Sequence, residues 1–116
     1  MLSKKYRLTK RGSFTYVYKK GEGGATSALR MQFVRSSSLK IGFSVSNKIG
    51  KAHVRNLVKR RMRAAMRELI KTVAGGYQIV FSAKIGIEAL SYQRIKGDMG
   101  YLLKRARMFK ADVECR

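Results

Sequence analysis

Hydrophobic and polar residues alternate in three short stretches of the chain, a pattern typical of β-strands with one buried face. These stretches cover residues 29–35, 39–46 and 77–83. Serines 36–38 separate the first two and favour a turn, so we expect these two strands to form an antiparallel hairpin. The third stretch carries apolar residues on both faces, including Val80, which indicates a more central strand.

Other stretches repeat their apolar residues at the spacing of an α-helix. Residues 12–20 predict a short helix with Ser13 as its N-cap, and a pattern weakened by glycines predicts a final helix over 91–109. The longest stretch runs from 51 to 71. Stepping about 100° per residue places its apolar residues on one arc and its basic residues on the opposite arc.

The order of these elements is helix, strand, strand, long helix, strand, helix, which predicts an α+β fold, an α–β sandwich built on one small sheet. We expect a single domain over residues 1–116, with a flexible connection at Gly21, Gly23 and Gly24. The ends, 1–9 and 112–116, should be irregular. The long helix should cover the apolar face of the sheet and leave the other face, which carries small and polar residues, accessible to a ligand.

The charge of the chain adds evidence about its function. The 116 residues include 27 Lys and Arg against 6 Asp and Glu, for a formal net charge of +21. A solvated helix face usually mixes signs, because like charges repel at four-residue spacing. The polar arc of the long helix instead gathers Asn56, Lys59, Arg60, Arg63, Arg67 and Lys71. This arrangement favours a nucleic-acid partner over an uncommitted basic surface.

Composition also limits where the protein can work. No apolar run approaches the roughly 20 residues needed to cross a membrane, and we expect no secretory signal near the N-terminus. Binding to a membrane surface is open on electrostatic grounds, but the basic helix lacks the Trp/Phe/Leu-rich face of interfacial helices. Cys115 is the only cysteine, so an intramolecular disulfide is excluded and a cytoplasmic location is the expectation.

The residues offer little material for an active site made of protein. His53 lies beside basic residues, and we interpret it as a surface helix residue rather than part of a catalytic triad. The six acids are scattered along the chain, whereas a metal-dependent nuclease needs carboxylates that converge on its cations. We therefore expect no catalytic residue and no protein-bound metal, although a protein-only nuclease is kept as an alternative.

Two aromatic residues of the first predicted helix have two interpretations. Phe14 and Tyr18 share a face, and either they pack this helix onto the sheet or they stack on the bases of an unpaired strand. Sequence-specific binding of DNA is less attractive, because a strand rather than a partner helix precedes the long helix.

A long motif resembles a known family. The segment GFSVSNKIGKAHVRNLVKRRMRAAMRE is similar to the signature of the bacterial ribonuclease P protein component. The matching residues are Lys48, Gly50, Ala52, Arg55, Asn56, Lys59, Arg60 and Arg63. YRLTKRGSFTYVYKKG is similar to the opening of that family, and GYQIVFSA to its strand after the long helix, so the resemblance covers nearly the whole chain.

The resemblance implies a fold and a role. The fold would contain a small mixed sheet packed with the long basic helix and the terminal helices, and a left-handed crossover where right-handed ones dominate generally. The role would be to help a catalytic RNA, with its magnesium ions, to remove the 5′ leader of precursor tRNA. A ribosomal or other structural RNA-binding protein is the alternative that shares the same size and charge.

The resemblance also implies two sets of binding residues. The set expected to bind the catalytic RNA is Lys48, Lys51, Arg55, Asn56, Lys59, Arg60, Arg61 and Arg63. The set expected to bind the leader is Phe14, Tyr18, Ser44, Ser46 and Arg67. The family usually has Arg where this chain has Leu57 and an apolar residue where it has Arg61. We expect the head of Arg61 to reach outward and to supply the charge missing at Leu57.

Overall fold

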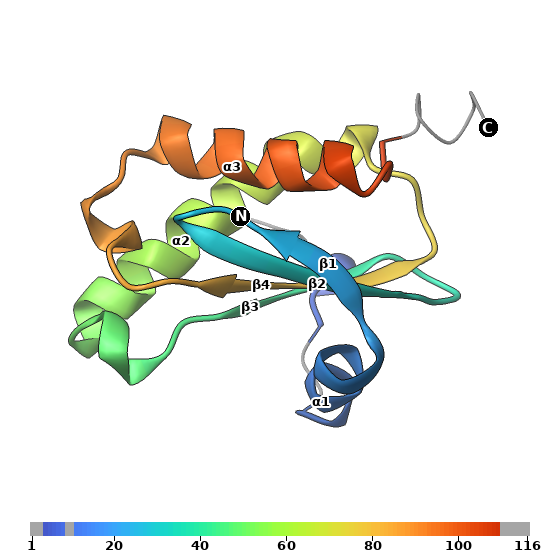
Figure 1. The fold of residues 1–116 in the computed structure, drawn as a ribbon, viewed down its shortest axis with the longest axis horizontal. Helices are drawn as coiled ribbons and strands as arrows, with labels where there is room; N and C mark the ends of the chain where they lie inside the picture. Colours follow the sequence, from blue (N-terminus) through green and yellow to red (C-terminus); the bar gives the residue numbers. More distant parts are fainter. Residues whose placement is uncertain (1–3, 9–10, 110–116) are drawn as a thin grey trace.

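A mixed sheet of four strands forms the centre of the computed structural model, which describes residues 4–8 and 11–109. The strands are β1 (Glu22–Ala25), β2 (Leu29–Arg35), β3 (Lys40–Ser44) and β4 (Tyr77–Ala83). Their order across the sheet is β1-β2-β4-β3 (Figure 1). β4 is antiparallel to β2 and parallel to β3, and β1 is antiparallel to β2.

Within the described residues, three α-helices cover the two faces of this sheet. Two of them, α2 (Ala52–Leu69) and α3 (Tyr92–Arg105), lie together on one face, whereas α1 (Arg11–Lys20) lies on the other (Figure 1). Short 3₁₀ turns complete the described structure: η1 (Lys4–Tyr6), η2 (Asn47–Ile49), η3 (Ile70–Thr72) and η4 (Ile87–Ala89). This confirms the predicted α+β class with a small mixed sheet. The handedness of the β3–α2–β4 crossover stays a prediction.

The main hydrophobic core lies between the sheet and the pair α2 and α3. The buried residues of α2 are Val58, Met62, Ala65 and Met66, and those of α3 are Ile95, Met99, Leu102 and Leu103. They join the same core as Ile41, Ile79 and Phe81 of the sheet. Each large apolar side chain buried there contributes about 1.5–3 kcal/mol relative to exposure. The predicted cover of the apolar face by the long helix is therefore confirmed.

A smaller core attaches α1 to the opposite face. Val17 is fully buried against Val80 and Leu8, with Phe14 packed at its edge. The ring of Phe14 lies directly over Gly42 of β3, where an added Cβ would come within 2.4 Å of the ring atom Cζ. Gly42 therefore provides the space in which this ring contacts the sheet.

Several local predictions are confirmed. Strands form over 29–35 and 77–83, and Val80 belongs to an interior strand that is paired on both sides. The final helix begins after Ser91, whose side-chain oxygen accepts a hydrogen bond from the backbone N–H of Arg94, but it ends at Arg105 and not at 109 as expected. The expected fraying of residues 112–116 concerns residues outside the described structure.

Other predictions are wrong, and each error has a physical reason. β2 and β3 do not form a hairpin, because β4 pairs between them. Gly21, Gly23 and Gly24 do not form a flexible connection, since β1 adds to the edge of the sheet there. Gly23 packs so closely on β2 that an added Cβ would meet the Met31 carbonyl oxygen. Ser13 is not the N-cap, because α1 already begins at Arg11.

The ends of two further elements also differ from expectation. The N-terminal arm is not wholly irregular: η1 is followed by a bridge in which the N–H of Leu8 donates to the carbonyl of Ile41 at 2.9 Å. The long helix does not continue to Lys71, because α2 ends at Leu69 and the chain tightens into η3.

Candidate nucleic-acid interface

The outward face of α2 gathers half of the predicted RNA-binding set. Burial of Val58 and Met62 turns the opposite side of the helix to solvent. Four of the predicted residues line one shallow hollow there: Asn56, Lys59, Arg60 and Arg63. One amide and three cations on successive turns of a rigid helix suit the phosphates of a structured RNA.

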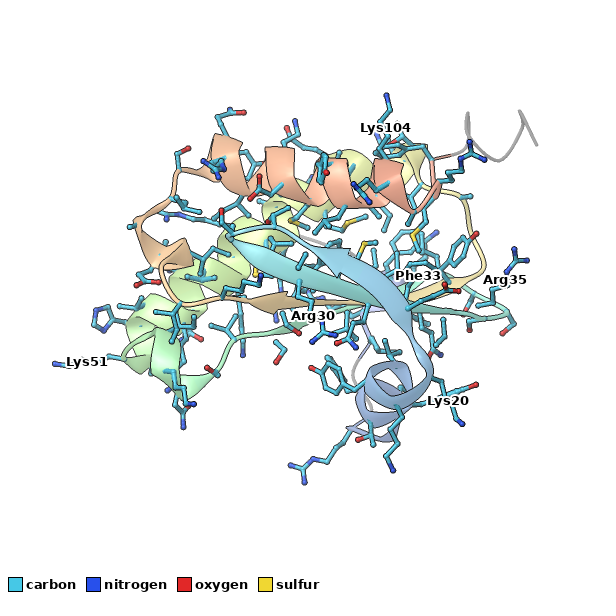
Figure 2. All side chains as sticks on the ribbon, in the orientation of Figure 1. Lys20, Arg30, Phe33, Arg35, Lys51 and Lys104 are labelled. Atoms are coloured by element: carbon cyan, nitrogen blue, oxygen red, sulfur yellow. The ribbon has the colours of Figure 1, made fainter. Side chains whose placement is uncertain are left out.

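The N-terminal end of α2 extends this basic surface. Lys48 of η2 and Lys51, the N-cap residue of α2, are both exposed, and Figure 2 shows Lys51 at the end of the molecule, pointing away from the sheet. Arg55 donates from Nη1 to Oδ1 of Asn47 at 2.6 Å, which ties the first turn of α2 to η2. The positive end of the helix dipole adds to these charges, so the surface favours anions.

Arg61 occupies a different environment from the one expected. Its Nη1 donates to the carbonyl oxygen of Leu90 at 3.1 Å, which anchors the segment after η4 to α2. The head of Arg61 is thus directed to another part of the protein rather than outward. Leu57, one turn earlier, is 38% exposed and leaves an uncharged place on the surface.

The face of the sheet beside α1 brings together three of the residues expected to hold a leader. Phe14 is half-buried and Tyr18 is exposed, with their ring centroids 6.4 Å apart. Ser44 of β3 lies in register with Ser82 of β4, which in turn pairs with Arg30 of β2. Figure 2 shows Arg30 on the α1 side of the sheet.

The contributions of Ser82 and Arg30 to that row were missed by sequence reasoning. The alternation within each strand does place them opposite the core, but only the strand order aligns them with Ser44. The result is an exposed cation next to small polar side chains, where unpaired RNA can approach the backbone.

The structure does not bring the remaining two leader residues to this row. Ser46 is exposed beyond the end of β3, and its carbonyl accepts the N–H of Ile49 at 3.1 Å. Arg67 lies on α2, across the sheet from α1, in a hollow that Lys71 and Tyr92 also line. Its place among the basic residues of α2 makes Arg67 a neighbour of the first binding set instead.

The acid within α2 is engaged by α3. Tyr92 donates its hydroxyl hydrogen to Glu68 Oε2, and Lys96 Nζ lies 3.0 Å from the same oxygen. The hydrogen bond from Tyr92 and the contact with Lys96 lower the pKa of Glu68. Burial, followed by the hydrogen bond to Glu68, raises the pKa of Tyr92 to about 12. Glu68 therefore links two helices and does not neutralise the hollow at Asn56 to Arg63.

Other described polar groups are likewise used in packing. Asp98 accepts from the hydroxyl of Thr26 at 2.9 Å and from Arg94 at 3.3 Å, which joins α3 to the start of β2. Over residues 4–8 and 11–109, no three His, Cys, Asp or Glu side chains form a group able to hold a metal ion. In the same residues, no helix has the length and apolarity required to cross a membrane.

The chain is similar to known proteins over most of its length. The family model for Ribonuclease P matches residues 2–107. The ribonuclease P protein component of Bacillus cereus (strain B4264) is 33% identical over 110 residues, covering 92% of this chain and 96% of that protein.

Two solved structures share the fold. The RNase P protein from Staphylococcus aureus superposes with a TM-score of 0.77 at 26% identity, covering 95% of this chain and 96% of that one. The RNase P protein from Thermotoga maritima superposes with a TM-score of 0.78 at 25% identity, covering 85% of this chain and 96% of that one. A match over almost the full chain, to sequences and structures alike, shows that this chain belongs to the ribonuclease P protein family.

Proposed function

We propose that this chain uses two separate surfaces in ribonuclease P: the outward face of α2 binds the catalytic RNA, and the sheet face beside α1 binds the unpaired 5′ leader of precursor tRNA. As a member of the family, the chain is a subunit of an endoribonuclease that matures tRNA 5′ ends. Such a role disfavours the alternative of a ribosomal protein. We propose a cytoplasmic location for the chain, because bacterial tRNA is transcribed in the cytoplasm.

The observation that carries this proposal is the sheet between the two surfaces. The hollow of α2 presents Lys59, Arg60 and Arg63 on one side of the molecule, whereas Phe14 and Arg30 belong to the other. A substrate and a catalytic RNA repel each other as polyanions. A cationic protein that contacts both lowers this repulsion and holds the leader in register.

We assign hydrolysis to the RNA subunit and its magnesium ions. Of the described carboxylates, Glu68 is engaged by Tyr92 and Lys96, and Asp98 by Thr26 and Arg94. Glu88 accepts from the backbone N–H of Gly86, and Glu22 lies apart from them on β1. What the protein supplies is affinity and alignment. Lys48, Lys51, Arg55 and Asn56 extend the RNA-binding surface towards the start of α2, and Arg67 extends it towards the end.

A cleavage assay on precursor tRNA at near-physiological magnesium tests this function. Protein alone, catalytic RNA alone and the two together are compared, and only the combination is expected to be efficient. Efficient cleavage by the protein alone would overturn the assignment of hydrolysis to the RNA. If roughly six phosphates are contacted, the logarithm of the RNA affinity should fall against the logarithm of salt with a slope of about −5.

A crosslinking experiment separates the two surfaces. Photo-reactive nucleotides in the leader are expected to react with Phe14 or Tyr18, whereas those in the catalytic RNA should react along Lys59 to Arg63. A structural RNA-binding protein would give no leader crosslink at α1, and that result would favour the alternative.

A further inference from the structure

A groove crosses the end of the sheet where β1 and β2 meet α1 and α3. One part is a hollow of about 430 Å³ between β1 and α3, and the other is a hollow of about 580 Å³ that reaches α1. Both are lined by Glu22, Phe33, Arg105 and Ala106, so they form one continuous depression. We call it the end groove, and its chemically distinctive residues are Tyr16, Lys20, Arg35, Tyr101 and Arg105.

Both aromatic rings and cations line the end groove. Tyr16 on α1 is 50% exposed and Tyr101 on α3 is 51% exposed, so both rings are accessible to a ligand. Arg105 donates from Nη1 to the hydroxyl oxygen of Tyr101 at 3.2 Å, with its guanidinium carbon 5.9 Å from the ring centroid. This contact holds the ring and the cation at fixed relative positions beside the hollow.

The charge of the end groove selects a class of ligand. Lys20, Arg35 and Arg105 are all exposed cations, and among the described lining residues Glu22 is the one acid. Exposed rings beside a cationic track are the means by which proteins hold unpaired nucleic acid, with bases on the rings and phosphates on the cations.

The end groove is separate from both surfaces assigned above. Figure 2 shows Lys20, Phe33 and Arg35 at one end of the molecule and Lys51, at the start of α2, at the opposite end. Tyr16 and Tyr18 are two residues apart on α1 and point to different sides of the helix, and of the two only Tyr16 lines this groove. We propose that the end groove is a second site for unpaired RNA, and that it binds leader nucleotides farther from the cleavage point than those beside α1. This proposal rests on the proposed function.

A glycine keeps part of the groove open. Gly24 of β1 lines the hollow against α3, and an added Cβ would meet only Leu102 Cδ2, at 3.4 Å, which is ordinary contact. Its φ does not lie in the left-handed region, so a larger residue can be accommodated by the backbone. Gly24→Val should therefore narrow the hollow without distorting the sheet.

The test compares two precursors on the reconstituted holoenzyme, one with a leader cut to the few nucleotides next to the cleavage point and one with a long leader. For Tyr101→Ala/Arg105→Ala we expect about a tenfold loss of affinity for the long-leader precursor, since one stacked base contributes about 1–3 kcal/mol. Affinity for the short-leader precursor should stay within twofold. Gly24→Val should likewise lower the affinity for the long-leader precursor and leave the affinity for the short-leader precursor nearly unchanged.

Lys104→Ala is the matched control. It removes the same charge from the same turn of α3, but Lys104 does not line the groove and extends away from the sheet (Figure 2). An equal loss for Lys104→Ala and the double variant would show a general charge effect and overturn the proposal. So would equal losses on both precursors, or no loss on the long one.

Two further outcomes keep the proposals distinguishable. The exposed edge of β1 could instead add a strand from an acidic peptide. If unpaired RNA of any length failed to displace a bound acidic peptide, that result would overturn the RNA site in favour of a protein partner. If the unaltered holoenzyme failed to bind the short-leader precursor, that result would refute the proposed function itself. It would be seen without any comparison with the long-leader precursor.

Discussion

The contact between Gly42 and Phe14 leads to a prediction with a calculable size. In Gly42→Ala the new Cβ would lie 2.4 Å from Cζ and 2.7 Å from Cε1 of Phe14, and 3.3 Å from Cβ of Leu8. Carbon atoms in contact prefer about 3.5–4.0 Å, so the ring must retreat by roughly 1 Å. Because Phe14 is part of the packing of α1 on the sheet, the helix has to move with it.

The cost follows from two opposing terms. Forcing an extra methyl group into a packed site costs about 1–3 kcal/mol. Replacing glycine by alanine within a strand returns about 0.5–1 kcal/mol of backbone entropy. We therefore expect a net loss of about 1–2 kcal/mol in the free energy of unfolding. At this chain length that is a fall in Tm of roughly 4–8 °C.

Thermal and urea unfolding, followed by circular dichroism, measure this loss. Gly97→Ala is the matched control, because its Cβ meets nothing within 4 Å and lies inside α3, so it should gain about 0.5–1 kcal/mol. Adding Phe14→Leu to Gly42→Ala should recover part of the stability by removing the clashing ring atoms. A Gly42→Ala protein as stable as the wild type would refute the reasoning.

Three other predictions concern function and pH. Gly42→Ala should weaken leader binding while leaving affinity for the catalytic RNA unchanged, as measured by filter binding of each RNA. Tyr92→Phe should lower Tm at neutral pH. Because the pKa of Tyr92 is raised from 10.0 to about 12 in the folded protein, the difference in Tm between variant and wild type should shrink as pH rises from 10 to 12. Leu57→Arg/Arg61→Leu should retain RNA affinity but lose about 1 kcal/mol of stability, since the Leu90 carbonyl loses its donor; unchanged urea unfolding would contradict this.

Local structure was largely determined by the order of residues. The alternation in 29–35 and 77–83 and the two opposed arcs of 51–71 depend on neighbours a few positions apart, and each gave a strand or helix close to the predicted bounds. The grouping of Asn56, Lys59, Arg60 and Arg63 was predictable for the same reason, because one rigid helix places them all. The family could also be identified, since its longest motif is a continuous segment.

Pairing between distant segments was decided only by the tertiary structure. Residues 36–38 allow a hairpin, yet β4 forms hydrogen bonds with both β2 and β3, a choice that depends on how α2 returns the chain to the sheet. That choice aligns Arg30 with Ser82 and Ser44, separates Arg67 from Phe14, and joins Tyr16 to Arg105 across the end groove. Periodicity reports which face of its own element a residue occupies. Which faces meet depends on the packing of the whole core, and that involves residues far apart in the chain.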